Sequence, residues 1–319
     1  MARGAIPPSP LPPRHGVDAQ RFRMPQDGSW TYLRDHLVER LSPGVPSWEV
    51  DRMLRAGEFV DASGTPLQAD APFVPQAAVW AHRDLPEEVV HPEPPVVLHR
   101  DERIVVVDKP HDMATMPRGR HVVQSALART RVLTGLDRLA PAHRLDRPTA
   151  GVLMLTVEQR WRGPYQRVFA DGLAHKEYLA VAPVLPRLAL PLVRRTHLVK
   201  DHGTHQAREV EDADPNAETL VELLETAPGA DSDGKELGLY RLTPRTGRTH
   251  QLRCQLNGLG IPIVGDPLYP VEQDVPLGFD APLQLLAAVL AFDDPVDGTP
   301  RRFVSRRRLA AWPGAWPLG

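Results

Sequence analysis

An uninterrupted apolar run, GVLMLT from Gly151 to Thr156, constrains the fold more than any other stretch of the chain. A strand on the surface of a sheet alternates polar and apolar residues, whereas a continuous apolar strand must be covered on both faces. The 319 residues are 42% hydrophobic, which is enough to fill a large core. The sequence therefore predicts a central strand with chain packed on both sides of it.

The remaining elements are interspersed along the chain. Because strands and helices follow no strict βαβ order, we expect an α/β fold of the α+β type, with a mixed, largely antiparallel central sheet flanked by helices. Residues 284–292 (QLLAAVLAF) fit a strand or a helix equally well. The other predicted strands lie within 96–110, 175–182, 220–226 and 238–244, and the helices lie at 122–133, at 158–170 and after Thr249, a candidate N-cap.

The composition divides the chain into three parts. Residues 1–27 are rich in Pro and Arg without apolar periodicity, which predicts a disordered tail. Residues 28–92 hold two short amphipathic helices, the second with Ser47 as its candidate N-cap, and short strands at 58–64 and 77–82, so we expect a small α/β module. The Pro-rich HPEPPV near residue 92 separates it from a larger domain, residues 93–319.

Charge and cysteine content exclude several classes of protein. The formal net charge of −2 argues against a general polyanion binder, although residues 141–200 carry ten Lys or Arg against four Asp or Glu. A single cysteine, Cys254, excludes a disulfide framework and fits the reducing cytoplasm. The N-terminus lacks an apolar signal region and no segment has about twenty apolar residues, so we expect neither export nor a membrane span.

The nine residues that lead into the central strand, HRLDRPTAG from His143 to Gly151, place Asp146 between Arg144 and Arg147. One arginine is enough for a salt bridge, and a turn needs none. Taken alone, however, an aspartate at this position is most often a turn or cap residue, and Arg147 is equally well a plain surface residue.

Two further stretches place unusual polar residues against apolar strands. Tyr178 lies in HKEYLAV, where packing is the ordinary role of a tyrosine. In GRTHQLR, a helix beginning near Thr249 places Arg253 on the same face as His250, and Arg248 before the first turn. Backbone N–H groups and the helix dipole favour anions there, so these residues suit phosphate recognition.

The sequences of these stretches and their order along the chain resemble those of the RluA-type pseudouridine synthases. The resemblance covers about two thirds of the chain, from near Val96 towards the C-terminus. Four motifs carry it in the family's order: IVVVDKP (104–110), HRLDRPTAG (143–151), KEYLAV (176–181) and RTGRTHQLRCQLNGLGIPIVGDPLY (245–269). One departure is Ala150, where the family usually has serine.

The resemblance implies a role for each candidate residue. Asp146 would be the catalytic residue, Arg253 its ion-pair partner, and Tyr178 the platform on which the target base packs. Arg144 would act in base extrusion. Arg147, Arg248 and His250 are our further candidates for RNA contacts. The resemblance implies an isomerase that acts on RNA without a cofactor.

The chemistry explains why these residue types occur together. Forming pseudouridine breaks a carbon–nitrogen glycosidic bond, turns the uracil and rejoins it through carbon. A carboxylate can attack the ribose or help to remove its proton, and the resemblance leaves both open. An arginine beside it favours the ionised form. The base must also leave its stack, and an aromatic ring then offers it a sequence-tolerant surface.

Other functions stay open at this point. The fold could serve a non-catalytic RNA-binding or ribosome-assembly protein, although such a protein would be free to lose Asp146. A hydrolase would pair Asp146 with a histidine, of which His143 is the nearest in sequence. His197, His202 and His205 invite a zinc site, but their spacing matches no strong template, so we predict a loop and no metal.

The resemblance also bears on partners and on the N-terminal module. We expect ribosomal or transfer RNA as the substrate, no DNA, and a monomer in the cytoplasm. LRAGEFVDASG (54–64) resembles the small αL-type RNA-binding domain that precedes many relatives. Its charges nearly cancel, so a packing module without RNA affinity is an equal alternative.

Overall fold

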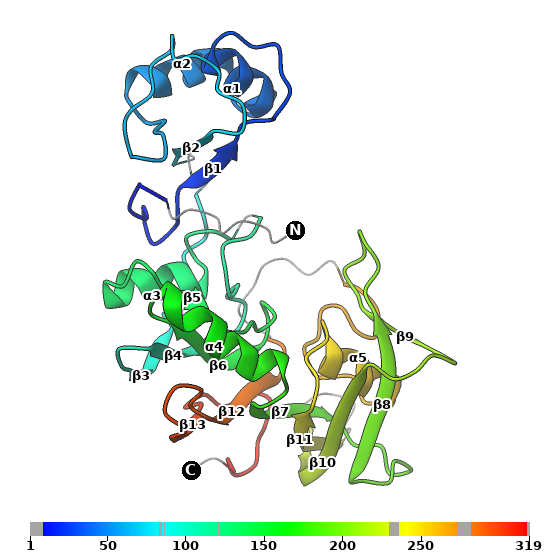
Figure 1. The fold of residues 1–319 in the computed structure, drawn as a ribbon. Helices are drawn as coiled ribbons and strands as arrows, with labels where there is room; N and C mark the ends of the chain where they lie inside the picture. Colours follow the sequence, from blue (N-terminus) through cyan, green and yellow to red (C-terminus); the bar gives the residue numbers. More distant parts are fainter. Residues whose placement is uncertain are drawn as a thin grey trace. The chain divides into compact units, whose positions relative to one another are not determined.

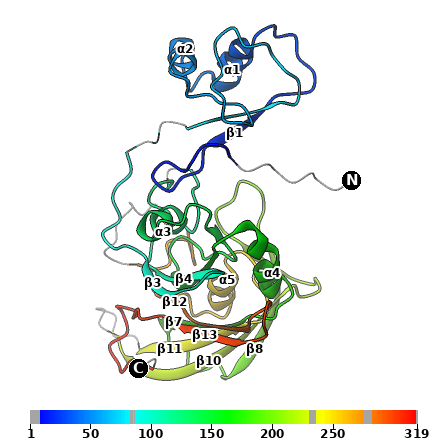
Figure 2. The same cartoon turned by 60° about the vertical axis from the view of Figure 1, so that its left-hand side comes forward.

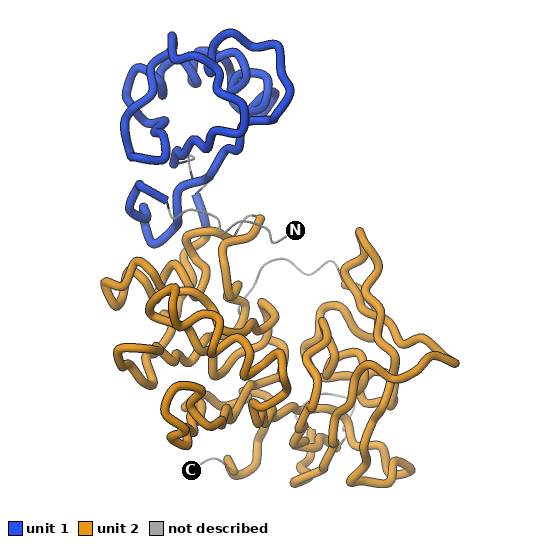
Figure 3. The backbone as a smooth tube through the Cα atoms, in the orientation of Figure 1, with its two compact units in different colours: residues 1–88 blue, residues 89–319 orange. Residues whose placement is uncertain are grey.

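A computed structural model describes residues 9–82, 85, 87–119, 121–229, 236–273 and 282–317. The chain forms two compact units, residues 1–88 and 89–319 (Figure 3). The division lies four residues before the boundary predicted at 92/93. Each unit has its own core and is described by itself.

The N-terminal unit contains two short helices and a strand pair. Its elements are β1 (Gln20–Arg23), α1 (Leu33–Leu41), α2 (Ser47–Arg55) and β2 (Ala78–Ala81), and β1 runs antiparallel to β2. Leu37 of α1, Leu54 of α2 and Phe59 are fully buried in its core. Both predicted helices are therefore confirmed.

Three predictions for this unit were wrong in detail. Residues 20–23 of the predicted tail form β1, because Phe22 is buried in the core; one apolar residue among four gives no recognisable period. Residues 1–8 of that tail lie outside the described residues. Ser47 is the first residue of α2 rather than its cap, which is Pro46. The predicted strand at 58–64 makes only isolated bridges at Val60.

The C-terminal unit is built on one large sheet (Figures 1 and 2). Its strands are ordered β3-β4-β6-β12-β7-β11-β10-β8-β9, with β13 paired to β12 and β5 to β6. Every pairing is antiparallel except β6 with β12. The bounds are β3 (Val96–Arg100), β4 (Ile104–Lys109), α3 (Ala126–Thr134), β5 (Ala140–Pro141), β6 (Ala150–Thr156), α4 (Gln159–Ala170), β7 (His175–Pro183), β8 (Leu192–Val199), β9 (Arg208–Val210), β10 (Ala217–Pro228), β11 (Glu236–Pro244), α5 (Gln251–Gly258), β12 (Leu285–Asp293) and β13 (Pro300–Val304).

The central apolar run is buried on both faces, as its composition predicts. All residues of β6 and of its neighbour β4 are buried. Val152 and Met154 pack in one cluster with α4, whereas Leu153 and Leu155 pack in another with α3. Alternate side chains thus reach opposite layers, so neither face of β6 meets water.

The predicted mixed, largely antiparallel sheet is confirmed, and so are its main elements. The ambiguous stretch 284–292 forms the strand β12. Four strands were missed, namely the two-residue β5, β8, β9 and β13. Strand β8 has four consecutive polar residues, 194–197, and β13 has two consecutive arginines, so neither shows the alternation of a strand and pairing with neighbouring strands decides their structure. Among the described residues, no helix has the length and apolar character that crossing a membrane requires.

The parallel junction between β6 and β12 depends on a glycine. Gly151 pairs with Ala287 and has φ = 113°, a conformation that L side chains rarely adopt. A Cβ on Gly151 would lie 2.2 Å from the carbonyl oxygen of Ala287. Tyr178 of β7 pairs with the other edge of Ala287. The close approach at Gly151 therefore sets the spacing between the start of β6 and Tyr178.

Replacing Gly151 with alanine is expected to destabilise the C-terminal unit by about 3 kcal/mol or more, because backbone strain and a backbone clash add. Gly135→Ala is the matched control, since Gly135 also has positive φ (68°) but open space around its Cα. It should cost only about 1–2 kcal/mol. Urea unfolding of both variants measures the difference, and equal losses would contradict the role of the Ala287 contact.

Candidate active site

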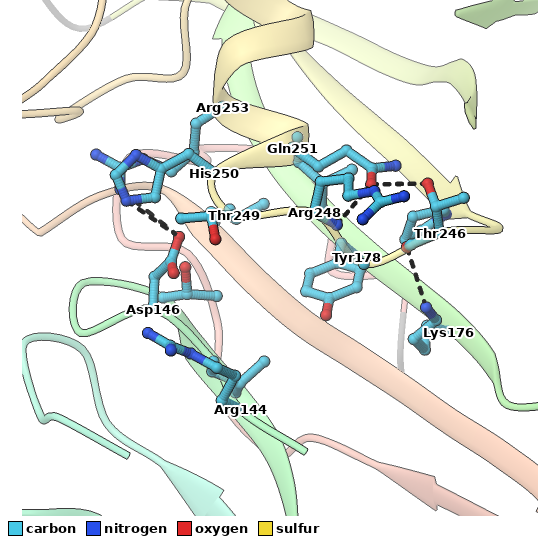
Figure 4. Close-up of a pocket in the computed structure, with 16 residues that line it drawn as sticks. Arg144, Asp146, Lys176, Tyr178, Thr246, Arg248, Thr249, His250, Gln251 and Arg253 are labelled. Carbon is cyan, nitrogen blue, oxygen red and sulfur yellow. Dashed lines mark hydrogen bonds and ion pairs between the residues drawn. The ribbon is translucent and has the colours of Figure 1, made fainter. Parts of the chain in front are cut away.

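A pocket opens where the turn before β6, strand β7 and the start of α5 meet (Figure 4). It brings together residues that are far apart in the sequence. The polar residues that line it are Arg144, Asp146, Thr149, Lys176, Tyr178, Thr246, Arg248, Thr249, His250, Gln251 and Arg253. Six of the seven predicted site residues are among them; Arg147 is not.

The Asp146 carboxylate is near two potential partners but hydrogen-bonded to neither. Its Oδ2 lies 3.7 Å from Nη1 of Arg253 and 3.9 Å from Nε2 of His250. Its side chain is 21% exposed, and no residue in the described part of the chain donates a hydrogen bond to it. Both oxygens therefore keep their capacity to engage a ligand.

The backbone around Asp146 is fixed by three buried or partly buried hydrogen bonds. Thr115 Oγ1 donates to the carbonyl of Leu145 (2.7 Å) and accepts from its N–H (3.1 Å). Lys109 Nζ donates to the carbonyl of Arg147 (3.0 Å) and to two more backbone carbonyls. Complete burial lowers the pKa of Lys109 to about 7. The turn is thus held on both sides of the aspartate.

Arg253 is bound mainly by a second aspartate, which the sequence analysis missed. Its Nε and Nη2 donate to the two carboxylate oxygens of Asp266 at 2.8 and 2.5 Å. Both side chains are almost completely buried. The predicted pairing with Asp146 exists only as the 3.7 Å approach. Asp266 therefore fixes the position of the guanidinium, and Asp146 interacts with its charge without a hydrogen bond. Asp266 belongs to the GDPLY end of the fourth motif, which was the available signal.

Tyr178 and Lys176 occupy the β7 side of the pocket. Burial, followed by the nearby Asp146 charge, raises the pKa of Tyr178. Lys176 Nζ donates to the carbonyl of Thr246 at 3.2 Å, and burial lowers its pKa. The tyrosine is neutral at physiological pH, and its ring faces the pocket in Figure 4. Lys176 was not predicted as a site residue, although it adjoins the tyrosine in the third motif.

The loop before α5 is organised by Gln251. Its Oε1 accepts from Thr246 Oγ1 (2.8 Å) and from the N–H of Arg248 (3.0 Å), while its Nε2 donates to Thr219 Oγ1 (2.9 Å). Thr249 was predicted to cap this helix, but the N-cap is His250, with φ = 56°. His250 and Arg253 both approach Asp146, in agreement with their expected common face.

The remaining arginines differ in position. Arg144 is exposed and lines the pocket as well as two neighbouring hollows, so it borders the whole site. Arg248 is exposed beside α5 and donates to the carbonyl of Asn216. Arg147 points elsewhere, because its guanidinium contacts His121 Nε2 at 3.1 Å.

His143 is unsuitable as a general base for Asp146. Its Nε2 accepts from the N–H of Met154 at 3.1 Å, and its ring stacks on Phe169. Burial lowers its pKa to about 3. The histidine that the structure brings to Asp146 is instead His250, at 3.9 Å. This distance is too long for the hydrogen bond that the hydrolase alternative requires.

The three histidines considered for zinc lie at the surface. His197 belongs to β8, where its Nδ1 meets the carbonyl of Asp214, and His205 pairs with Glu272. His202 is exposed. Across the described ranges, His, Cys, Asp and Glu form no group of three or more that could hold a metal ion.

Comparison with known proteins identifies the family. Residues 103–258 match the model of the RNA pseudouridylate synthase family. The chain is 32% identical to the dual-specificity RNA pseudouridine synthase RluA of Salmonella typhi over 65% of its own length and 91% of that protein. It belongs to the RluA-type family of RNA pseudouridine synthases.

Further comparisons agree with this assignment. RluA of Yersinia pestis is 30% identical over 65% of this chain and 97% of that protein. Human RNA pseudouridylate synthase domain containing 1 has the same fold, with a TM-score of 0.55 and 22% identity over 69% of this chain and 86% of that one. The predicted family, the isomerase activity and the RNA substrate are therefore confirmed.

The stability of this pseudouridine synthase should fall with decreasing pH through His143. The unfolded histidine takes up a proton below about 6.5, whereas the folded one stays neutral down to about pH 3. Stability is then lost at roughly 1.4 kcal/mol per pH unit below pH 6.5. The free energy of unfolding, measured with urea between about pH 5.5 and 4, should fall less steeply with decreasing pH in His143→Gln than in the wild type. The difference should be roughly 1.4 kcal/mol per pH unit. An unchanged dependence on pH in His143→Gln would contradict this role of His143.

Breaking the buried pair should be costly. Asp266→Asn leaves the Arg253 guanidinium buried without its hydrogen-bonded counter-ion, so we expect a loss of about 3–5 kcal/mol in the free energy of unfolding. Glu222→Gln breaks the half-exposed Arg241–Glu222 pair and should cost less than about 1 kcal/mol. Comparable losses in thermal or urea unfolding would show that Asp266 does not anchor the arginine.

Proposed function

We propose that Asp146 is the catalytic carboxylate of this RNA pseudouridine synthase. The observation that carries the proposal is its accessible carboxylate, which lies in the pocket close to Arg253 and receives no hydrogen bond from the described residues. Asp266, by contrast, is fully buried and its carboxylate is bound to Arg253. Of the two aspartates beside the guanidinium, only Asp146 is free to react with a ribose.

Arg253 acts as the electrostatic partner of Asp146. A guanidinium keeps its charge at any physiological pH, and at 3.7 Å this positive charge acts directly on the Asp146 carboxylate. Its own position is fixed by Asp266, so this charge stays aimed at the site when substrate enters. The aspartate can then attack the ribose or help to remove its proton beside a positive charge of fixed position.

Tyr178 serves as the platform for the extruded uracil. Its ring lines the same pocket as Asp146, and its neutral phenol offers a face on which any base can stack. Arg144, exposed at the edge, takes the space that the base leaves or holds a phosphate. Arg248 and His250 contact the RNA beside α5, and Arg147 contacts its backbone from the adjoining hollow.

The substrate proposed is structured ribosomal or transfer RNA, modified by a monomer in the cytoplasm. The Salmonella relative is a dual-specificity enzyme by name, which supports keeping both RNA classes in any test. No cofactor is invoked, because the reaction is an isomerisation for which a carboxylate, a stacking ring and fixed charge suffice. A non-catalytic assembly role on the same fold is the competing proposal, and the accessible Asp146 argues against it.

Asp146→Asn should abolish the release of tritium from RNA labelled at carbon 5 of uracil. That hydrogen is lost only when uracil is rejoined through the labelled carbon, and asparagine can neither attack nor accept the proton. We expect a rate reduction of at least about 10³-fold, with RNA affinity and folding preserved. Unmodified ribosomal and transfer RNA are tested separately, without added metal or nucleotide.

Asp137→Asn is the matched control, because Asp137 is an exposed aspartate of the same unit outside the pocket. Its rate should equal that of the wild type. Tritium release by Asp146→Asn near the wild-type rate would contradict the catalytic role. RNA binding without release by the wild type on either RNA would favour the assembly role.

A further inference from the structure

His250 is held in a strained backbone conformation that places its ring at the reacting carboxylate. Its φ of 56° is left-handed, which costs a residue with a Cβ about 1–2 kcal/mol. Glycine would avoid that cost. The imidazole lines the pocket, and its side chain is only 11% exposed. Such strain at a site is a reason to look for a function of the side chain.

The hydrogen bonds behind the ring fix its tautomer. The hydroxyl of Tyr269 accepts from the N–H of Ala207 (2.7 Å) and donates its only proton to the carbonyl of the same residue (2.9 Å). Nδ1 of His250, 3.3 Å from this hydroxyl, must therefore donate to it. Burial lowers the pKa of His250 to about 4, so the ring carries one proton, on Nδ1. Nε2 is left as an acceptor.

This acceptor faces another acceptor. Nε2 lies 3.9 Å from Oδ2 of Asp146, and neither atom receives a hydrogen bond from the described residues. A half-buried lone pair without a donor costs free energy until a ligand supplies one. The ligand group that fits beside Asp146 must therefore be a hydrogen-bond donor.

We propose that Nε2 of His250 accepts a hydrogen bond from the 2′-hydroxyl of the target uridine. This inference rests on the proposed function, in which the ribose lies at Asp146 and the base at Tyr178. In Figure 4, His250 lies with Asp146 at one side of the pocket, and Tyr178 and Lys176 lie at the other. A donor at His250 therefore belongs to the sugar rather than to the uracil.

The contact would orient the ribose for reaction. Holding O2′ at His250 places C2′ one bond away and C1′ two bonds away, next to the Asp146 carboxylate. These are the two carbons at which an aspartate would remove a proton or attack. The same contact distinguishes RNA from DNA at the modified nucleotide, because only RNA carries the 2′-hydroxyl. His250 is thus a positioning and specificity residue.

A double-mutant cycle between protein and RNA tests the contact. The transfer or ribosomal RNA transcript that releases tritium is made with uridine or with 2′-fluorouridine, which keeps the size of the substituent but cannot donate. Wild type, His250→Gly and His250→Asn are compared by kcat/KM on both transcripts. Fluorine also changes the reactivity of the sugar, but that change is shared by all proteins and cancels in the ratio.

In His250→Gly, kcat/KM should fall about tenfold on uridine RNA but change little on 2′-fluorouridine RNA. Asparagine tolerates a left-handed backbone and its side chain retains a hydrogen-bond acceptor. His250→Asn should therefore recover part of the wild-type preference for uridine RNA over 2′-fluorouridine RNA. His15→Gly is the control, because His15 is an exposed histidine with φ = 52° in the N-terminal unit. It should keep the full wild-type preference.

Each outcome separates this inference from the proposed function. If His250→Gly keeps the wild-type ratio between the two transcripts, the contact is wrong even though the enzyme is active. A purely structural role would lower the melting temperature and reduce activity equally on both transcripts, which also contradicts it. If the wild type binds RNA without tritium release, the proposed function fails. The contact is then tested separately, by whether the ratio of dissociation constants for the two transcripts differs between the wild type and His250→Gly.

Discussion

The close approach of Gly151 to Ala287 is the contact on which the site depends. Strand β12 lies between β6 and β7, and Ala287 pairs with Gly151 on one edge and with Tyr178 on the other. Asp146 stands five residues before Gly151, on a turn fixed by Thr115 and Lys109. The carboxylate and the aromatic ring therefore meet because one strand pairs with both of their elements. A side chain at residue 151 would force β12 away.

The two aspartates near Arg253 divide two tasks between them. Asp266 takes both hydrogen bonds of the guanidinium and is fully buried, which gives the arginine one position. Asp146 receives the field of that charge without hydrogen bonds to it. A hydrogen-bonded carboxylate would have to break those bonds to react, whereas Asp146 keeps its oxygens available. Stability and reactivity are thus assigned to different residues of one charge cluster.

Much of the fold and the site could be predicted from local sequence. The apolar run of β6 dictated a strand covered on both faces, and the motifs named six of the residues that share the pocket. What failed depends on contacts distant in sequence. Strand β8 becomes recognisable beside its partners β10 and β9, and the role of Asp266 is visible in its bonds to Arg253, although the fourth motif already contained this residue. The N-cap of α5 is the left-handed His250 rather than Thr249. The side chain of Gln251 accepts a hydrogen bond from the N–H of Arg248 and so holds the loop before the helix.

A crystal structure of Asp146→Asn bound to its RNA would show directly where the target uridine lies. We expect the uracil against Tyr178, the ribose beside residue 146, and O2′ within hydrogen-bonding distance of Nε2 of His250. Arg253 should remain on Asp266. An extruded base held away from Tyr178, or a ribose that does not reach residue 146, would contradict the assignment of this pocket as the place where the glycosidic bond is broken and remade.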